Sequence, residues 1–315
     1  MLLISLLAED QLISAMKATT SILGFMQQFH NEESCKGHLY QLKWGNGYTC
    51  RKCGHEVSVK GRTKFHRRCQ KCKYDESFTA HTLFHKIKFA LPKAFLMVYQ
   101  LSTMKKGMSS CELSRQFGIH QETAWYFRQK VMLAMRNQKH RLLNNSVEVD
   151  ETVIGGHEAG KPGRSHGRKK KVAIAIEVDY PADEGTPRVR AADARIIDNY
   201  SSQELGRIID EMIEPDALVT TDGLPAYQTA VQPRIHDVWL SDKGENFQSL
   251  HWHIFNLKSW IRGIHHHISV KHAQKYLDEF HFRFKNRNWI QACPNKLLKL
   301  MVKTSKTSYS QVIAN

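Results

Sequence analysis

The sequence predicts a multi-domain α/β protein, because its 315 residues change in texture from one segment to the next. Two Cys-x-x-Cys pairs mark a small metal-stapled module, helical periodicity follows, and strand-like segments such as VEVDETVI begin at residue 147. The predicted parts are an N-terminal helical segment (1–34), the cysteine module (35–80), a helical region (81–137), a mixed-sheet domain with C-terminal helices (147–290) and a C-terminal tail (291–315).

The cysteine module carries the most specific motif. Cys50-x-x-Cys53 is followed, after fifteen residues, by Cys69-x-x-Cys72. Each pair places two sulfurs on one side of a tight turn, and the intervening segment is long enough for a short hairpin that brings the pairs together. Disulfides or redox pairs are the alternative, but seven cysteines, three of them scattered, fit a reducing compartment better. We therefore predict a zinc ribbon with a structural Zn²⁺.

The chain is strongly basic, with a net charge of +16 and a pI near 9.5. Such a surplus indicates a polyanionic partner, either nucleic acid or an acidic membrane. No apolar run in the sequence is long enough to span a bilayer. We therefore expect DNA as the partner and no membrane.

The segment GMSSCELSRQFGIHQETAWYFRQKVMLAM has the pattern of a helix-turn-helix. Ser109 and Glu112 can form a capping box at the first helix, and Gly118 allows a sharp turn after it. An ordinary packed helix pair would give the same pattern. If the segment binds DNA, the polar residues left for contacts on the second helix are Gln121, Arg128 and Lys130.

Two aspartates in the mixed-sheet domain are the candidates for catalysis. Asp150 is expected at the end of one hydrophobic strand, and Asp222 closes another, LVTTD. Taken singly, each is also a plausible turn or cap residue. The order strand, strand, strand, helix (201–213), strand is that of an RNase H-like core, in which the first and fourth strands are neighbours. Paired carboxylates there can hold Mg²⁺ or Mn²⁺, and two ions about 4 Å apart promote phosphodiester transfer.

Longer stretches extend these motifs: CKGHLYQLKWGNGYTCRKCG, TAWYFRQKVMLAM, VEVDETVIGG, VTTDGLPAY and HWHIFNLKSWIRGIHHHISVKHAQKYLDEFHFRFKNR. Over residues from about 24 to 287 they resemble the IS1595-type (ISXO2-like) insertion-sequence transposases. The resemblance implies a zinc ribbon joined to an RNase H-like, DDE-type catalytic domain, with Asp150 and Asp222 as its first two acids. It also implies a prokaryotic, cytoplasmic, nucleoid-associated protein that acts as a homo-oligomer, since two DNA ends must be brought together.

The third acid of the family pattern has a different residue here. In many relatives a Glu is followed seven residues later by a Lys; this chain has His251 before Lys258. Branches of the family resemble it in the pattern H-x4-N-L-K, with Asn256 at the Asn position. Seven residues are close to two helical turns, so both side chains project from one face. Neutral imidazole is a softer ligand without charge, which favours Mn²⁺.

Other residues remain as alternatives to His251, which could instead be a surface or DNA-contacting histidine. Glu279 is a secondary carboxylate candidate, whereas Glu151 should point away from Asp150 because side chains alternate along a strand. His253 lies on a different helical face and is a weaker candidate.

Basic and aromatic residues surround the predicted site. Six of the eleven residues from Lys161 to Lys171 are Lys or Arg, and this segment either binds the DNA backbone or forms a solvated hairpin. Trp252 and Trp260 either stack on an unpaired base or belong to the core. The candidate DNA contacts in this domain are Arg164, Arg168, Lys169, Lys170, Asn256 and Arg262.

Together these features predict a transposase that binds the terminal inverted repeats of an insertion sequence and cuts and joins DNA with divalent metal. Asp150, Asp222 and His251 would hold the ions, and Lys258 would position phosphate or the attacking 3′-hydroxyl. The alternatives are a catalytically inactive, transposase-derived DNA-binding regulator and a metal-dependent nuclease without strand transfer.

Overall fold

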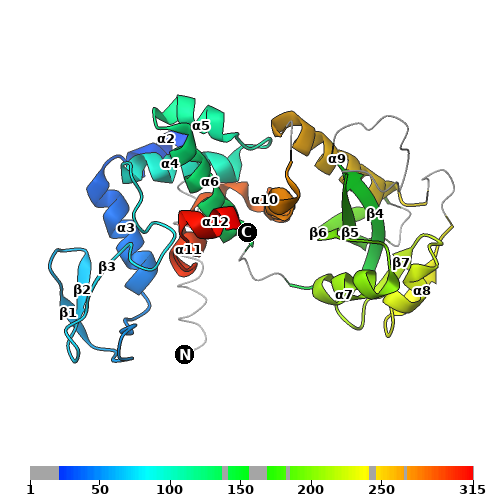
Figure 1. The fold of residues 1–315 in the computed structure, drawn as a ribbon, viewed down its shortest axis with the longest axis horizontal. Coiled ribbons are helices and arrows are strands. Elements are labelled where there is room, and N and C mark those ends of the chain that lie inside the picture. The colour runs from blue at the N-terminus through cyan, green and yellow to red at the C-terminus, as the bar shows by residue number, and fades with distance from the viewer. Residues whose placement is uncertain are drawn as a thin grey trace. The chain divides into compact units, whose positions relative to one another are not determined.

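The computed structural model describes residues 21–136, 141–155, 169–181, 185–240, 246–265 and 268–314. The chain divides into two compact units, residues 1–138 with 288–315 and residues 139–287, and each is described by itself. Figure 1 labels the elements of both.

The N-terminal part of the first unit contains two helices, α2 (Ile22–Gln28) and α3 (Glu32–Trp44). The prediction of one helix over 1–34 is therefore wrong for its described part. The chain breaks before α3 because the Asn31 side chain caps that helix by accepting a hydrogen bond from the Ser34 backbone N–H at 2.8 Å. Helix α3 continues into the range assigned to the cysteine module, and residues 1–20 lie outside the described part.

The cysteine module is a small antiparallel sheet of three strands, β1 (Ser58–Lys60), β2 (His66–Cys69) and β3 (Asp75–Ser77), in the order β1-β2-β3. Its buried carboxylate Glu76 lies 2.7 Å from the Lys43 ammonium on α3. This ion pair joins the sheet to the preceding helix, so the module is fixed to α3.

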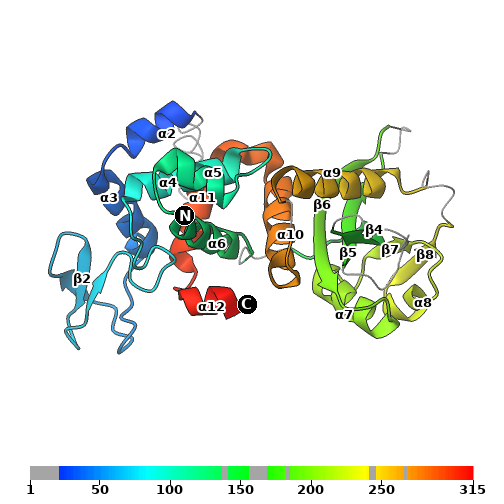
Figure 2. The same cartoon turned by 45° about the horizontal axis from the view of Figure 1, so that its top comes forward.

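The helical region contains α4 (Leu91–Thr103), α5 (Ser110–Phe117) and α6 (Gln121–Arg136). As predicted, Ser109 caps α5 by accepting from the Glu112 backbone N–H, and Gly118 ends it in the left-handed region at φ 58°. After the 3₁₀ helix η1 (Arg287–Ala292), α11 (Cys293–Lys303) packs against α4 and α6, as Figure 2 shows, and α12 (Tyr309–Ala314) follows. The C-terminal residues thus complete the core of the first unit.

The second unit is built on a five-stranded mixed sheet in the order β6-β5-β4-β7-β8. Strand β4 pairs antiparallel with β5, which pairs antiparallel with β6, whereas β7 runs parallel to β4 and β8 parallel to β7. This is the predicted RNase H-like arrangement, with the first and fourth strands adjacent. The strands are β4 (Ser146–Ile154), β5 (Lys170–Asp179), β6 (Arg188–Ile197), β7 (Leu218–Thr221) and β8 (Ile235–Val238).

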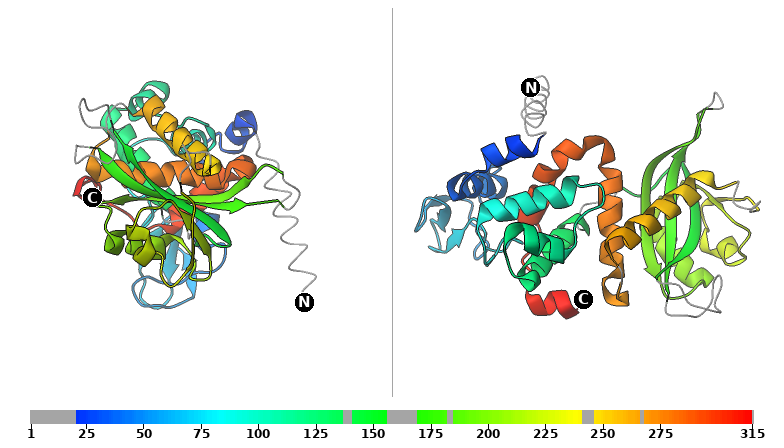
Figure 3. Two further views of the ribbon diagram at one scale, coloured as in Figure 1. Left: turned by 90° about the vertical axis from the view of Figure 1, so that its right-hand side faces the viewer. Right: turned by 90° about the horizontal axis from the view of Figure 1, so that it is seen from above.

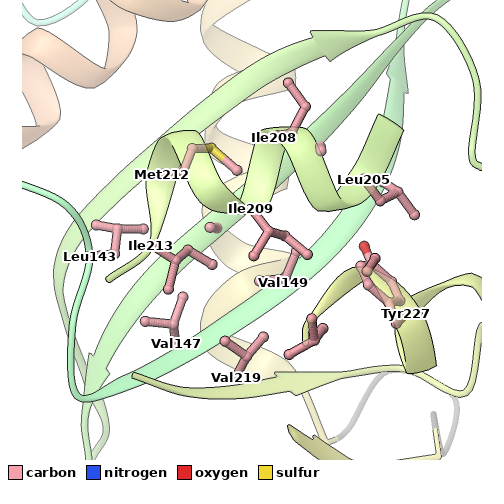
Figure 4. Packing of buried hydrophobic residues seen from close by; sticks show 14 of the residues in the cluster. Leu143, Val147, Val149, Leu205, Ile208, Ile209, Met212, Ile213, Val219 and Tyr227 are labelled. Atoms are coloured by element: carbon pink, nitrogen blue, oxygen red, sulfur yellow. The ribbon is translucent and has the colours of Figure 1, made fainter. Parts of the chain in front are cut away.

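Helix α7 (Ser202–Met212) forms the core against one side of this sheet. The sequence Ser201-x-x-Glu204 predicts a capping box at its start. The Ser201 hydroxyl does cap α7 by accepting from the Glu204 backbone N–H, whereas the Ser201 N–H donates to Asn199 Oδ1. Figure 4 shows the apolar side of α7 over Val147 and Val149 of β4, with Tyr227 of α8 (Ala226–Ala230) beside them. Residues alternate across a strand, so the intervening residues of β4 face the other side of the sheet.

That other side carries the C-terminal helix α9 (Gln248–Ile264), while α10 (Val270–Lys285) lies along the edge strand β6, where the Gln274 side chain bonds to the backbone of Ala194 and Ile196. Helix α9 contacts β4 and β5, and α10 contacts β6. The right-hand view of Figure 3 shows α9, in gold, crossing the strands. The central strand is therefore covered by α7 on one face and by α9 on the other.

A pH dependence of stability follows from His38 on α3. Burial between Phe29 and Phe95 lowers its pKa to about 4. In the unfolded chain the pKa of this imidazole is near 6.5, so between pH 4 and 6.5 the unfolded chain binds more protons than the folded one. The contribution of the neutral imidazole to the unfolding free energy is therefore complete above pH 6.5 and is lost as the pH falls towards 4. His38→Leu should flatten the pH profile of the unfolding free energy by about 1–3 kcal/mol. Urea unfolding from pH 4 to 7 measures this, with exposed His30→Leu as the matched control, and an unchanged slope would contradict it.

Candidate metal centres

The four cysteines of the ribbon converge. Their sulfurs all lie within 4.8 Å of one another, with Cys50 to Cys72 at 3.5 Å and Cys53 to Cys69 at 3.6 Å. A disulfide would need about 2.05 Å, whereas four Zn–S bonds of about 2.3 Å in a tetrahedron place the sulfurs about 3.8 Å apart. The cysteines are free thiols in an arrangement that fits zinc, as the spacing predicted.

Tight turns prepare these sulfurs for a metal. Gly54, at φ 71°, lets the chain reverse after the first pair, and its backbone N–H donates to the Cys50 carbonyl. Desolvation opposes ionisation of Cys50, but hydrogen bonds from the backbone of Lys52 and Cys53 lower its pKa to about 6. A thiolate at neutral pH is the form that ligates zinc.

In the second unit, strand register brings the two aspartates together. The parallel ladder of β4 and β7 ends at the pair Val149↔Thr221, so Asp150 and Asp222 are the next residues on adjacent strands. The prediction that Asp150 ends its strand is wrong, because β4 continues to Ile154 through its antiparallel pairing with β5. Asp150 instead marks the end of the parallel ladder, which preserves its closeness to Asp222.

Backbone amides orient one oxygen of each aspartate. The Oδ1 atom of Asp150 accepts from the Glu151 N–H at 2.7 Å, and that of Asp222 accepts from the Leu224 N–H at 3.1 Å. Both negative charges, together with that of Glu151, add to burial in raising the pKa of Tyr227. Tyr227 belongs to the α7 side of the sheet, so Glu151 lies on that side, as the alternation predicted.

Helix α9 places His251 and Lys258 on the Asp150 side. The His251 Nε2 atom lies 3.8 Å from Asp150 Oδ2, and their side chains are 41% and 22% exposed. The pKa of Lys258 is lowered by burial and by Arg262, while the charge of Asp150 raises it. Two helical turns therefore direct an imidazole and an ammonium to the same carboxylate.

The candidate metal ligands Asp150, Asp222 and His251 are less closely spaced than the four cysteine sulfurs of the ribbon. Among the described residues, only the four cysteines gather three or more ligand atoms within 4.8 Å. Asp150, Asp222 and His251 are spread more widely than the shell of a single ion.

Two of the alternatives to His251 are wrong. Glu279 on α10 is fully buried and bonds to Arg283 at 2.6 Å, since the α10 face that packs on the sheet encloses this pair. His253 is buried too, with its Nε2 atom 3.1 Å from that of His281, because it lies on the core side of α9. Both side chains are therefore buried in contacts with other residues.

The predicted DNA contacts of α6 need correction. Arg128 and Lys130 are 2% and 3% exposed, and they donate to the carbonyls of Met108 at 2.9 Å and His85 at 3.1 Å. Helix α6 is covered by α5 and by α11, so more of its surface is buried than a two-helix pattern predicts. Gln121, at the start of the helix, is exposed.

The remaining candidates lie around the aspartates or outside the described part. Arg164 and Arg168 fall among residues that are not described. Lys169 and Lys170 are partly exposed at the start of β5, and the charge of Lys169 reaches Lys258. On α9, Asn256 and Arg262 are exposed, Trp252 is 60% exposed and Trp260 only 8%, so Trp260 belongs to the core.

The sheet topology, the paired aspartates and the four-cysteine site define an RNase H-like transposase with a zinc ribbon. Residues 142–285 match the ISXO2-like transposase domain, and residues 30–75 match the transposase zinc-ribbon domain. The two matches together span more than half of the chain. The chain therefore belongs to the IS1595-type (ISXO2-like) transposases, as its motifs predicted.

Comparison with individual proteins adds little. No protein with a curated description matches the chain. The crystal structure of the Mos1 mariner paired end complex with Mn is 13% identical, with 66% of this chain and 78% of that chain covered and a TM-score of 0.25. The Mos1 transposase paired-end complex with left transposon end is 12% identical, with 64% and 78% covered and a TM-score of 0.20. TM-scores this low do not support a shared fold, so the fold assignment rests on the strand order.

No described helix is long and apolar enough to cross a membrane.

Zinc removal should unfold the ribbon. Its core is small, with Trp44 and Tyr48 packed on Cys50 and Cys69, and a metal that binds only the folded state stabilises it by mass action. We expect one zinc per chain by elemental analysis. Cys53→Ser should lose the zinc and the protection of residues 50–77 from hydrogen exchange, while strands β4 and β5 of the second unit stay protected. Exposed Cys111→Ser is the matched control, and a Cys53→Ser protein that keeps its zinc would contradict the assignment.

Proposed function

We propose that this transposase binds the terminal inverted repeats of its own element and catalyses metal-dependent strand cleavage and strand transfer. The observation that carries the proposal is the meeting of three elements at one place. The β4–β7 register sets Asp150 beside Asp222, and α9 brings His251 within 3.8 Å of Asp150. Carboxylates and an imidazole brought near one another from separate elements are a donor set for divalent ions.

In this proposal, Asp150, Asp222 and His251 hold two Mg²⁺ or Mn²⁺ ions. When bound, such ions activate the attacking oxygen and stabilise the leaving oxygen in phosphodiester transfer. Lys258, on the same face of α9 as His251, positions a phosphate or the attacking 3′-hydroxyl. The site has two carboxylates instead of three, so Mn²⁺, which accepts imidazole more readily, is the better-matched ion.

DNA would approach along basic and aromatic side chains. Arg262 lies one helical turn beyond Lys258 on α9. Lys169 directly precedes β5, whose first residue is Lys170, and the charge of Lys169 acts on Lys258. With Arg164, Arg168 and Asn256 they would contact the backbone near the reacting phosphate. The zinc ribbon and the α5–α6 pair, with exposed Gln121, would recognise the element's end. Two ends must be joined, so we propose that the protein acts as an oligomer on DNA.

A DNA-binding regulator without catalytic activity is the second candidate. His251 stands in place of the third acid, so the metal site has one negative charge fewer. Weaker metal binding at such a site favours a regulator without catalytic activity. The regulator would bind the same ends and leave them uncut.

Cleavage and joining of a labelled fragment of the element's end, with Mg²⁺ or Mn²⁺, separates the two candidates. We expect wild type to join the ends, Asp222→Ala to give no product, and His251→Ala to lose about 10–100-fold in rate. His251→Glu restores a carboxylate and should shift the preference from Mn²⁺ towards Mg²⁺. Asp216→Ala is the matched control, because Asp216 is an exposed carboxylate that precedes the start of β7, whereas Asp222 follows the end of this strand. Specific binding by wild type without any metal-dependent product would support the regulator.

Trp252 should contribute to binding unpaired DNA near the site. Its ring meets that of Phe255 edge-on at 5.9 Å on the exposed surface of α9, next to His251. Stacking on a base contributes about 1–3 kcal/mol, so Trp252→Ala should weaken binding of an end with an unpaired terminus about 5–100-fold. A fully paired end should bind with almost unchanged affinity. Equal losses for the two DNAs, measured by fluorescence anisotropy, would contradict stacking.

A further inference from the structure

Glu148 is a buried carboxylate close to the candidate metal site that no step of the proposed reaction uses. It lies on the central strand β4, between Ile176 of β5 and Thr220 of β7, and is only 3% exposed. Only Val149 separates it from Asp150, so the side chains of Glu148 and Asp150 both face the α9 side of the sheet. A carboxylate buried at such a place destabilises the fold unless neighbouring groups offset its desolvation.

The neighbours of Glu148 connect it to the start of α9. The Tyr180 hydroxyl, just after β5, donates to Glu148 Oε1. Burial raises the pKa of Glu148, whereas the Tyr180 hydroxyl, the Leu250 backbone amide and the charge of His251 lower it. Leu250 and His251 are in the first turn of α9, and Glu148 Oε2 makes no close hydrogen bond to any described residue. The carboxylate therefore faces the helix start.

Helix α9 needs such a partner because its own sequence supplies no cap. Its N-cap residue is Phe247, whose side chain has no hydrogen-bond acceptor, and the first turn contains no acidic residue. The amides of a first helical turn carry partial positive charge, which a nearby carboxylate stabilises. The carboxylate that stabilises the first turn of the 17-residue helix α9 is therefore Glu148 of the sheet and not a residue of the helix itself.

Aromatic rings enclose the same place. Tyr180 contacts Trp239 with ring centroids 6.4 Å apart, Trp239 contacts Phe247 at 6.0 Å, and Phe247 contacts His251 at 6.4 Å. This chain of rings runs from the residue that binds Glu148 to the imidazole beside Asp150. It lowers the local exposure to water and so strengthens the electrostatic interaction between the carboxylate and the helix start.

We propose that Glu148 is a positioning residue, which anchors the first turn of α9 to the central strand and thereby holds His251 beside Asp150. The assignment rests on the proposed metal site and adds to it a residue that acts through His251. The same strand then carries a ligand, Asp150, and the group that fixes the position of a second ligand. Sequence patterns alone do not reveal this role, because Glu148 reads as a polar residue of an alternating strand.

A double-mutant cycle on Mn²⁺ binding tests the proposal with the zinc-loaded, full-length protein. Loss of a group that orients a metal ligand weakens metal binding about 10–100-fold. We expect Glu148→Leu to raise the Kd for Mn²⁺ at least about tenfold when His251 is present, and less than about twofold in His251→Ala. Glu148→Gln keeps an acceptor for the Tyr180 hydroxyl and should stay within about threefold of wild type.

Two further variants separate positioning from general destabilisation. Tyr180→Phe removes only the hydroxyl that binds Glu148, and it should weaken Mn²⁺ binding by about threefold, again only when His251 is present. Glu177→Leu is the matched control. That carboxylate is also buried on a strand, but it bonds to Arg141 at 2.6 Å, so its loss should have the same effect with and without His251.

Hydrogen exchange in the absence of metal gives a second readout. Glu148→Leu should speed exchange in residues 247–254 about tenfold and leave residues 270–285 unchanged. Equal losses of Mn²⁺ affinity with and without His251, or a Glu148→Gln protein as impaired as Glu148→Leu, would overturn the role of Glu148. Neither readout requires DNA, so failure of strand transfer alone would contradict the proposed function and leave this cycle intact.

Discussion

The parallel pairing of β4 with β7 is the constraint on which the candidate active site depends. It ends at Val149↔Thr221, one residue before each of the two aspartates. A shift of the register by one residue would turn Asp150 to the α7 side of the sheet and Val149 to the α9 side. The site is therefore protected by the same apolar contacts that stabilise the fold, because Val149 cannot leave the core without a large loss of buried area.

The two faces of β4 have different roles. One face packs against α7 through Val147 and Val149, and the other presents Glu148 and Asp150 to α9. A buried carboxylate such as Glu148 on a central strand opposes folding, so its presence there indicates that the α9 side of the sheet is specialised for more than packing. The position of helix α9 relative to β4 sets where His251, the third ligand of the proposed metal site, lies.

Some of this architecture could be predicted from the sequence because the signals are local. The Cys-x-x-Cys spacing predicts the ribbon, and the capping boxes at Ser109 and Ser201 predict the starts of two helices, which the structure confirms. The hydrophobic strand before Asp222 likewise ends where predicted. Such features depend on residues within a few positions of one another.

Other features depend on distant packing and could not be predicted in this way. Arg128 and Lys130 are buried, and they donate to the carbonyls of Met108 and His85, which lie 20 and 45 positions earlier in the chain. Asp150 lies inside its strand because β5 prolongs the pairing of β4. The contact of Glu148 with Tyr180 joins residues 32 positions apart. A single sequence gives no local signal for any of these contacts.

In the proposed site, Asp150, Asp222 and His251 together hold the metal. The most direct measurement is the anomalous scattering of Mn²⁺ in crystals of the zinc-loaded protein. We expect Mn²⁺ peaks within about 2.0–2.3 Å of both carboxylates and of the His251 imidazole. Mn²⁺ bound by the aspartates with His251 turned away would contradict the third ligand, and no Mn²⁺ at the β4–β7 edge would contradict the metal site itself.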